Sequence, residues 1–462
     1  MEAAAEMEET VHESASPKKH PPGLKLLFFT EMWERFSYYG LRSLLILYLT
    51  TSLISGGLGF DPATASLIYG FFTGACYFTP LVGGWLTDHF IGKRLAITIG
   101  GVTMALGNMV LFMDQSHAAL YTGLALIILG NGFFKPNIST LLGELYSEQD
   151  KRRDSAFTIF YMGINFGALF APLICGFLAE DFFKTTVNGA VQYGFKYAFL
   201  AASIGMIVGQ LAFNLLGKRF LGDIGMKPAG KKTAGNPKAA NEPLTEKEKQ
   251  RTLAIIIITC FVVFFWAGFE QAGSSMTLYT RDFVDRTVFG WEIPISWFQS
   301  VNPLFIILLA PLVSYMWTKL ASSKRGDLPV PIKMGLGMTL LGTGFLILMA
   351  AVLKTGSDAE NITVKANLLF IVFTYLFHTL GELFLSPIGL SLVSRIAPVK
   401  LASLLMGVWL ASTGVANILG GQIAALTASF GFLEIFAIIG GLAIFFGLLL
   451  ISLNRVLVKM MD

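Results

Sequence analysis

The chain has 462 residues, of which 54% are hydrophobic and only 14% are charged, and its formal net charge is +4. A soluble chain carries about a quarter charged residues, so this composition excludes an ordinary soluble globular protein. The positive charge is spread over many segments, so a nucleic-acid-binding surface is not indicated.

Long apolar segments follow one another along most of the chain. About 20 apolar residues are needed to cross a bilayer, and the sequence predicts an all-α membrane protein with twelve such helices. An acidic, Pro- and Ser-containing segment, 1–23, is predicted to be a disordered cytoplasmic tail. A polar stretch, 218–250, is predicted to link two six-helix bundles, 24–217 and 251–458, and 459–462 form the C-terminal end. The predicted spans are 24–54, 62–90, 93–114, 117–145, 155–180, 195–217, 251–281, 295–319, 331–354, 365–395, 400–428 and 430–458.

The distribution of Lys and Arg predicts how these helices are oriented. With the N-terminus in the cytoplasm, 25 of the 34 basic residues lie on the cytoplasmic side, six lie on the opposite side and three lie within spans. This asymmetry is typical of multi-pass membrane proteins. We therefore predict a plasma (inner) membrane protein with both termini in the cytoplasm.

The two halves resemble each other in sequence. The segment Pro80–Arg94 aligns without a gap on Pro311–Arg325, and Pro-Leu-Val, one Thr and the closing Lys-Arg recur at an offset of 231 residues. This indicates an internal duplication. The first copy resembles the cytoplasmic loop signature of the major facilitator superfamily, in which Asp88 and the basic pair are predicted to act as a conformational latch. Simple anchoring by Lys93 and Arg94 is the alternative.

Seven ionisable residues lie inside the predicted spans, where an unpaired charge costs several kcal/mol and therefore indicates function. They are Glu31, Glu34, Arg35, Arg42, Lys135, Glu270 and Glu382. At 100° per residue, one face of the first helix carries six polar side chains, which cannot face lipid. These six are Glu31, Glu34, Arg35, Tyr38, Tyr39 and Arg42. Such a face suits binding of a charged substrate, and a salt-bridge lock between helices is the alternative.

The signs of these seven charges predict coupling to an ion. Four carboxylates oppose three bases, which leaves one excess negative charge in a medium of low dielectric constant. Protonation of a carboxylate relieves such an excess, and a bound cation would do the same. We therefore hypothesise that the proton is the coupling ion, and we predict no metal or organic cofactor.

Several motifs resemble those of one transporter family. Phe28–Gly40, with its Glu31-x-x-Glu34-Arg35 core, looks like the first-helix signature of the proton-dependent oligopeptide transporter (POT) family. Similar patterns for helices four, five, seven and ten are Gly130–Asn137, Phe160–Gly167, Phe265–Gln271 and Gly381–Pro387. The resemblance covers nearly the whole chain. It implies a major facilitator fold of two pseudo-symmetric bundles and a symporter, working as a monomer, that imports di- and tripeptides with protons by alternating access.

The resemblance also implies roles for individual residues. Arg35 and Lys135 would bind the peptide carboxylate, and Glu382, Asn165 and Asn302 would bind its amino terminus. The side-chain pockets would be lined by Tyr38, Tyr69, Tyr161, Trp266 and Trp409, with Tyr39, Arg42 and Ser386 also on the binding face. Glu31 and Glu34 would handle protons with Arg35, and Glu270 would alternate between protonation and pairing with Lys135 or Arg42. Pro387 would be a bending point for gating, with a static kink as the alternative.

Two observations limit or compete with this interpretation. Animal members of the family carry a histidine in the second helix that is associated with proton handling, and Gly70 stands at that position here. A transporter of another small solute, such as nitrate, an amino acid or a drug, could use the same scaffold, but plant nitrate relatives lack an acid at the Glu270 position. No enzyme motif is visible, so an integral membrane enzyme or receptor is the weaker alternative.

Overall fold

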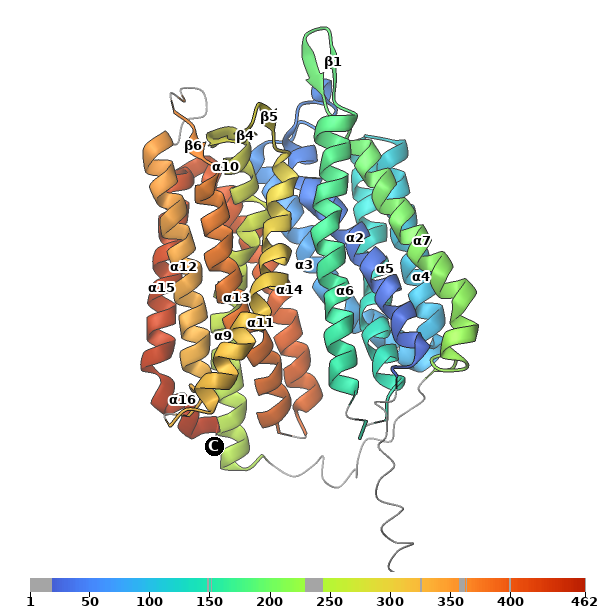
Figure 1. Ribbon diagram of the computed structural model, residues 1–462, viewed down its shortest axis with the longest axis vertical. Coiled ribbons are helices and arrows are strands. Elements are labelled where there is room, and N and C mark those ends of the chain that lie inside the picture. Colours follow the sequence, from blue (N-terminus) through green and yellow to red (C-terminus); the bar gives the residue numbers. More distant parts are fainter. Residues whose placement is uncertain are drawn as a thin grey trace, which may run out of the picture.

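The computed structural model describes residues 19–147, 149–150, 152–228, 244–324, 326–356, 362, 364–398 and 400–461. The described part is dominated by long helices that run roughly alongside one another (Figure 1). Short 3-10, π-helical and strand segments connect them.

Six long helices form the N-terminal half, on the right of Figure 1. They are α2 (Pro22–Thr50), α3 (Pro62–Leu86), α4 (Lys93–Met113), α5 (His117–Glu144), α6 (Arg153–Phe177) and α7 (Phe195–Leu221). The short elements of this half are η1 (Leu53–Ser55), η2 (Thr87–Ile91), η3 (Leu178–Phe182) and the antiparallel pair β1 (Thr185–Val187) and β2 (Ala190–Gln192). The β1–β2 hairpin projects from one end of the molecule (Figure 1), which we call the hairpin end.

The C-terminal half contains the helices on the left of Figure 1. They are α9 (Glu246–Phe269), α10 (Ser275–Phe283), α11 (Val301–Ala321), α12 (Val330–Thr355), α13 (Leu369–Ile396), α14 (Ala402–Phe430), α15 (Phe432–Ser452) and α16 (Asn454–Met461). The 3-10 segment η4 (Glu270–Gly273) joins α9 to α10, and η5 (Ile295–Ser300) leads into α11. The remaining strands are β3 (Val284–Asp285), β4 (Thr287–Val288), β5 (Trp291–Glu292) and β6 (Ala366–Asn367), of which β3 pairs with β6 and β4 with β5.

Each half has its own apolar core. One cluster of buried residues is built mainly from α2 to α7, and a second is built from α9 to α16. The short helix α16 and the start of α9 lie at the end opposite the hairpin (Figure 1), which we call the linker end. The chain is therefore a pair of helical bundles with a long interface between them.

Local sequence signals explain where several helices begin. The Asp61 side chain accepts a hydrogen bond from the Thr64 amide at 2.9 Å, and Pro62 occupies the first helical position of α3. Both features favour a helix start. The hydrogen bonds from Thr64 also hold the pKa of Asp61 below its usual value. At the start of α9, Thr245 and Glu248 form a reciprocal capping box.

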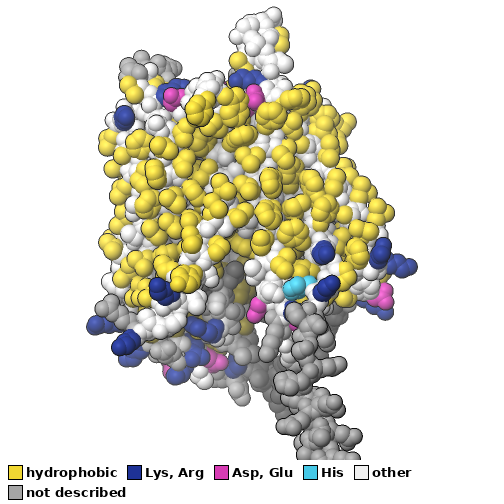
Figure 2. All heavy atoms as spheres, viewed as in Figure 1, with side chains coloured by type: hydrophobic (Ala, Val, Ile, Leu, Met, Phe, Trp, Pro, Cys, Tyr) yellow, Lys and Arg dark blue, Asp and Glu magenta, His cyan; other side chains and the backbone are white. Residues whose placement is uncertain are grey.

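Eleven of the described helical segments are long and apolar enough to cross a membrane. The surface between the two ends is largely hydrophobic, and Lys and Arg gather toward the ends (Figure 2). The helix α2 is outside this group because it is richer in charge. Its 29 residues would still extend about 44 Å at about 1.5 Å per residue. A twelfth span through α2 therefore stays a prediction.

The helix bounds differ from the predicted spans in several places, and the predicted span 251–281 is divided into α9, η4 and α10. The last apolar helix, α15, ends at Ser452, whereas the span was predicted to run to residue 458. The polar Asn454 and Arg455 interrupt the apolar run there, and α16 forms a separate helix up to Met461, where a tail was predicted. Helical structure also reaches into both ends of the predicted linker, to Leu221 and from Glu246. Residues 1–18 of the predicted tail, 229–243 of the linker and Arg325 of the repeat lie outside the described residues.

The two halves meet closely at the hairpin end. The buried Glu180 carboxylate accepts hydrogen bonds from the amide of Ile295 (2.6 Å) and from the amide (3.0 Å) and hydroxyl (2.6 Å) of Ser296. Glu180 belongs to η3 and Ser296 to η5, so this carboxylate joins the N-terminal half to the first turn of η5. Anionic side chains are stabilising at such a helix start. Further bonds between the halves are Arg281–Thr50, Trp297–Leu173, Gln299–Ser43 and Ser300–Leu169.

A glycine contact brings α3 and α14 together across the same interface. A Cβ atom added to Gly70 would lie 2.6 Å from the Cα atom of Gly421. Such a separation is shorter than van der Waals contact, so the backbones can approach this closely only because both residues are glycines. The histidine of animal family members therefore has no room at position 70 in this arrangement.

Candidate functional site

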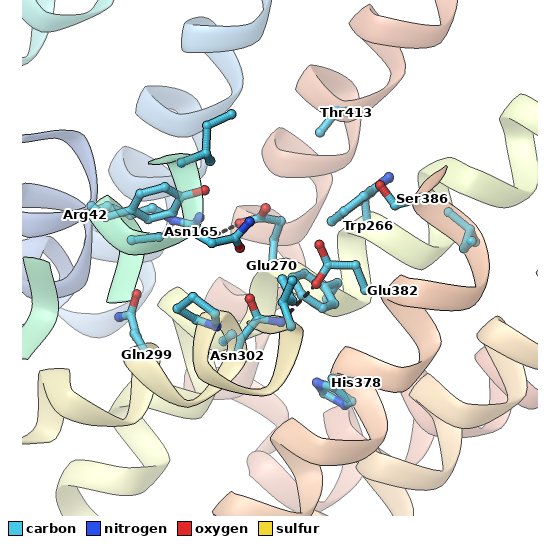
Figure 3. Close-up of a pocket in the computed structure, with 18 of the residues that line it drawn as sticks. Arg42, Asn165, Trp266, Glu270, Gln299, Asn302, His378, Glu382, Ser386 and Thr413 are labelled. Atoms are coloured by element: carbon cyan, nitrogen blue, oxygen red, sulfur yellow. Dashed lines mark hydrogen bonds and ion pairs between the residues drawn. The ribbon is translucent and has the colours of Figure 1, made fainter. Parts of the chain in front are cut away.

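A cavity of about 380 Å³ lies between the two halves, and helices from both contribute to its wall. Figure 3 shows ten of the lining residues by name. Most of the predicted binding residues line this cavity. These are Tyr39, Arg42, Lys135, Tyr161, Asn165, Trp266, Glu270, Asn302, Glu382, Ser386 and Trp409.

Five predicted site residues lie behind the cavity wall instead. Glu31, Glu34, Arg35, Tyr38 and Tyr69 are buried and do not line the cavity. The six polar residues of the first helix do avoid the outer surface as predicted, but only Tyr39 and Arg42 reach the cavity. The rotation of α2 therefore divides the predicted face between the cavity and the interior of the N-terminal half.

The Glu31-x-x-Glu34-Arg35 motif forms one compact ion cluster. Arg35 bonds to both oxygens of Glu34, with Nη2 donating to Oε1 at 2.8 Å, and its Nε lies 3.1 Å from Glu31 Oε1. The second oxygen of Glu31, Oε2, is buried and has no hydrogen-bond partner among the described residues. One guanidinium thus serves two carboxylates, and the cluster is one positive charge short.

The fifth-helix motif explains why this ion cluster is buried. A Cβ atom at Gly167 on α6 would lie 2.4 Å from the Met32 carbonyl oxygen and 2.7 Å from the Arg35 Cβ. The glycine therefore lets α6 pack directly on the turn of α2 that carries the ion cluster. The first-helix and fifth-helix motifs, about 130 residues apart in the sequence, therefore pack directly against each other.

Arg42 connects the two halves through a buried ion pair. Its Nη2 bonds to Glu270 Oε2, and its Nε donates to the Tyr69 hydroxyl at 2.8 Å. Glu270 is the first residue of η4, where the α-helical winding of α9 changes to a 3-10 segment. The predicted pairing of Glu270 with Arg42 is present in this structure, and Tyr69 supports that pair without lining the cavity.

Lys135 lies on the cavity wall without a carboxylate partner among the described residues. Its ammonium group is 4.0 Å from the centre of the Tyr77 ring, a cation–π contact. Tyr77 also lines the cavity. A positively charged group is therefore exposed to the cavity and held by a neutral ring.

The opposite charge enters the cavity from the C-terminal half. Glu382 on α13 accepts a hydrogen bond from the Asn302 amide group at 2.9 Å, and the same amide donates to the Thr379 hydroxyl at 3.0 Å. Figure 3 shows Glu382 and Asn302 facing each other across the wall formed by α11 and α13. One hydrogen bond from the Asn302 amide therefore orients the carboxylate, and the bond to Thr379 holds that amide in place.

Several residues of the cavity wall were not predicted from the sequence. They are Tyr77, Gln299, Tyr375, His378 and Thr413, together with apolar neighbours. Tyr77 lies eight residues after Tyr69, about 80° further round α3 at 100° per residue. This spacing places both tyrosines toward one side of α3. It is the sequence signal from which Tyr77 could have been predicted as a cavity residue.

The two residues predicted to take part in gating lie outside the cavity. Asp88 is exposed in η2 and bonds to neither basic neighbour. Lys93 instead pairs with Glu144 of α5, and Arg94 donates to the Gly222 carbonyl at 2.8 Å. The predicted role of Asp88 and this basic pair as a conformational latch stays a prediction. Pro387 lies inside α13, which continues to Ile396.

Comparison with known proteins identifies the family. A family model described as the POT family matches residues 94–233 and 233–440. The chain belongs to the POT family. It is 33% identical to an uncharacterized transporter, YclF, of Bacillus subtilis, over 96% of this chain and 95% of that one. It is also 33% identical to the peptide transporter YePEPT of Yersinia enterocolitica, over 87% of each chain.

A solved POT structure shows the same architecture. The crystal structure of a peptide transporter POT in complex with sulfate has a TM-score of 0.87 and 31% sequence identity, and the match covers 96% of this chain and 97% of that chain. This POT chain is therefore an integral membrane protein with the transporter fold of its family, the major facilitator fold of two helical bundles. The ion cluster, the Arg42–Glu270 pair, Lys135 and Glu382 are features of a transporter interior.

Proposed function

We propose that this protein is a symporter that imports di- and tripeptides together with protons by alternating access. The observation that carries the proposal is the arrangement of charge in the cavity. Lys135 on the N-terminal half and Glu382 on the C-terminal half both face the same space, and neither forms an ion pair with another described residue. A small zwitterion placed between them would satisfy both.

Binding of such a ligand would link the two halves. The peptide carboxylate would meet Lys135, and its ammonium group would meet Glu382 beside Asn302. A ligand that contacts both bundles favours the conformations in which they are close, so occupancy and closure are coupled. Relatives of this chain that are named for di- and tripeptide transport support this choice of substrate.

Glu31 is the proposed proton carrier of the Arg35 cluster. Glu34 receives two hydrogen bonds from Arg35, whereas Glu31 has only an ion-pair contact with Arg35 and keeps an unpartnered buried oxygen. A proton on Glu31 removes the excess negative charge of the cluster and supplies a donor for that site. Glu270 is the proposed second carrier, because its protonation would release Arg42 and with it a bond between the halves.

The proposal also covers the orientation of the protein in the membrane and its oligomeric state. We propose that the linker end and both termini lie on the cytoplasmic side of the plasma (inner) membrane, and the excess of Lys and Arg on that side supports this orientation. We propose a functional monomer that uses the proton and no other cofactor, because each bundle has its own core and the site is built from one chain.

Uptake of radiolabelled Ala-Ala into proteoliposomes that contain the purified protein tests the proposal. A pH gradient, acidic outside, should drive accumulation above equilibrium, and an uncoupler should abolish it. Uptake that ignores the gradient would contradict proton coupling. N-acetylated and C-amidated Ala-Ala should each compete at least about tenfold more weakly than free Ala-Ala, since each leaves one buried charge unpaired. Equal competition would contradict the two-ended site.

A second candidate substrate class is a single zwitterion shorter than a dipeptide. A POT family transporter of known structure, 29% identical to this chain with a TM-score of 0.85, is described in complex with 5-aminolevulinic acid. That molecule also carries a carboxylate and an ammonium group. Its competition with Ala-Ala in the same assay decides between the two classes.

A further inference from the structure

A second cavity lies at the linker end of the C-terminal half, and the proposed mechanism does not use it. Its volume is about 600 Å³, and it shares no lining residue with the cavity of the candidate site. The wall comes from α9, the loop before α12, the start of α12, the last turn of α13 and the helix α16. We call this cavity the linker-end pocket.

The charged groups of the linker-end pocket leave an excess of positive charge. Arg251 of α9 and Arg395 of α13 both line it. The described lining also contains the carboxylate of Asp327, but this group already accepts a hydrogen bond from the Lys333 ammonium group at 2.6 Å. Glu248, three residues before Arg251, belongs to the capping box of α9 and does not line the pocket. Two guanidinium groups therefore meet a cavity whose described carboxylate is neutralised by another base.

The two arginines are held in different ways. Arg251 is half-buried, and its Nε donates to the Met461 carbonyl of α16 at 3.1 Å, so the end of α16 helps to fix its position. Arg395 is exposed in the last turn of α13 and has no ion-pair or hydrogen-bond partner among the described residues. A guanidinium group presents a planar set of donors that matches a phosphate group. One arginine is therefore held at the pocket, and the other can turn toward an anion.

The remaining lining of the linker-end pocket is apolar. It consists of Pro329, Val330, Ile396, Val458 and Met461. A free phosphate ion gains nothing from apolar surface, whereas the glycerol and acyl carbons of a phospholipid are stabilised by contact with it. The combination of two arginines with an apolar wall therefore favours a lipid over a free anion.

The helix α16 places the linker-end pocket at the level of the membrane surface. It follows α15, an apolar span that ends at Ser452. Leu457 of α16 is buried in the C-terminal core, whereas Arg455 and Lys459 are exposed. A helix with an apolar face and a basic face is typical of the membrane interface, and Figure 2 shows Lys and Arg gathered at this end of the C-terminal half. The pocket therefore lies where lipid headgroups begin.

We propose that the linker-end pocket binds an anionic phospholipid, with the phosphate held between Arg251 and Arg395 and the glycerol and first acyl carbons against the apolar wall. Basic pockets at the membrane surface bind such headgroups. The inference does not depend on the proposed substrate. Because α9 leads into Glu270 and α13 carries Glu382, a phosphate shared by both arginines ties together the linker ends of two helices that reach the candidate site.

Lipid binding to the purified full-length protein in a neutral detergent tests the inference. Native mass spectrometry measures the Kd for dioleoylphosphatidylglycerol and for dioleoylphosphatidylcholine, which have the same acyl chains and the same phosphate. The choline headgroup adds a cation that the two arginines repel. Phosphatidylglycerol should bind at least about tenfold more tightly, and it should raise the midpoint of thermal unfolding as its concentration rises. Equal affinity for the two lipids would overturn the inference.

Arg395→Gln is the main variant, because no described residue depends on a bond to this side chain. It should weaken phosphatidylglycerol binding by about tenfold or more, the effect of losing a hydrogen bond to a charged group. Arg395→Lys keeps the charge and should retain part of the affinity. Arg455→Gln is the matched control, because it removes the same charge from an exposed arginine of α16 that does not line the pocket. The control should change the Kd by less than about twofold. Equal weakening by Arg395→Gln and Arg455→Gln would mean general attraction to a basic surface and would overturn the pocket.

Inorganic phosphate distinguishes a lipid site from a site for a free anion. At the same concentration as the lipid, inorganic phosphate should neither displace phosphatidylglycerol nor raise the midpoint of thermal unfolding. If it does both, and Arg395→Gln abolishes both effects, the pocket binds free phosphate and the lipid assignment is wrong. These measurements need no transport, so a failure of Ala-Ala uptake contradicts the proposed function and leaves this inference in place.

Discussion

The hairpin end and the linker end of this transporter differ in how the two halves are joined. At the hairpin end, hydrogen bonds cross from one half to the other, and Glu180–Ser296 is the most completely bonded of them. At the linker end, the described ion pairs Lys93–Glu144 and Lys333–Asp327 each stay within one half. Opening the hairpin end requires bonds between the halves to break, whereas separation at the linker end leaves these pairs intact. The structure therefore has the geometry of a transporter closed at the hairpin end.

Glu270→Gln should have the largest effect, because it changes the one described ion pair that joins the halves beside the cavity. A glutamine cannot exchange a proton, and it leaves the Arg42 charge without a carboxylate partner. We expect accumulation of Ala-Ala against a gradient to be lost, because breaking a buried pair costs about 3–5 kcal/mol, more than about a hundredfold in an equilibrium constant. Proteoliposome uptake at an imposed pH gradient measures it.

Glu292→Gln provides the matched control for this change. Glu292 is exposed in β5 at the hairpin end, where it bonds to Arg286 of the same half and lies 3.9 Å from the Lys184 ammonium group of the other half, both at the surface and away from the cavity. Surface pairs contribute little, so its uptake should equal that of the wild type. Full proton-driven accumulation by the Glu270 variant would show that this pair is not part of the coupling.

Gly70→Ala should have the second-largest effect, because it inserts a methyl group where α3 and α14 cross between the halves. Overpacking of this kind costs about 1–3 kcal/mol, and here it acts against the closed hairpin end. We expect the initial rate of Ala-Ala uptake to fall about tenfold. Gly441→Ala on α15 is the control, because a Cβ atom at that position has open space. Equal uptake by both variants would mean that the α3–α14 crossing tolerates separation during transport.

Glu180→Gln should have a smaller effect. It should change the fraction of molecules that are open at the hairpin end more than the rate of Ala-Ala uptake. The amide keeps one acceptor oxygen and loses the charge, so the bonds to the amides of Ile295 and Ser296 weaken. A change of about 1 kcal/mol would increase the open population at the hairpin end about fivefold. Alkylation of a cysteine placed at Gln299, near this contact, by a membrane-impermeant reagent measures that population, with Cys260 first replaced because it is exposed.

Glu144→Gln at the linker end completes the comparison. It removes a carboxylate from the pair with Lys93, whose two helices, α4 and α5, belong to the same half. Alkylation at position 299 should stay at the wild-type level in this variant. An equal increase in both variants would show that the two ends do not differ in the way described.

The sequence was sufficient to locate the helices, because apolar runs of this length have few alternatives. It also identified most of the charged cavity residues, because a charge within a membrane span is costly and therefore indicates function. It could not separate Arg35 from Arg42. Both lie on one face of α2, and which of them reaches the cavity depends on how closely Gly167 lets α6 approach. Tyr69 and Tyr77 show the same limit, because the crossing of α3 with its neighbours decides which tyrosine supports Arg42 and which faces the cavity.

The contact between Lys135 and Tyr77 has a consequence for the speed of recognition. An ammonium group held by an aromatic ring leaves it at a cost of about 1–2 kcal/mol, whereas separation of a buried salt bridge costs about 3–5 kcal/mol. A peptide carboxylate bound as proposed would therefore displace a weak neutral contact rather than compete with another anion. The ring keeps the lysine oriented between transport cycles, so ligand exchange at this position does not have to wait for an ion pair to dissociate.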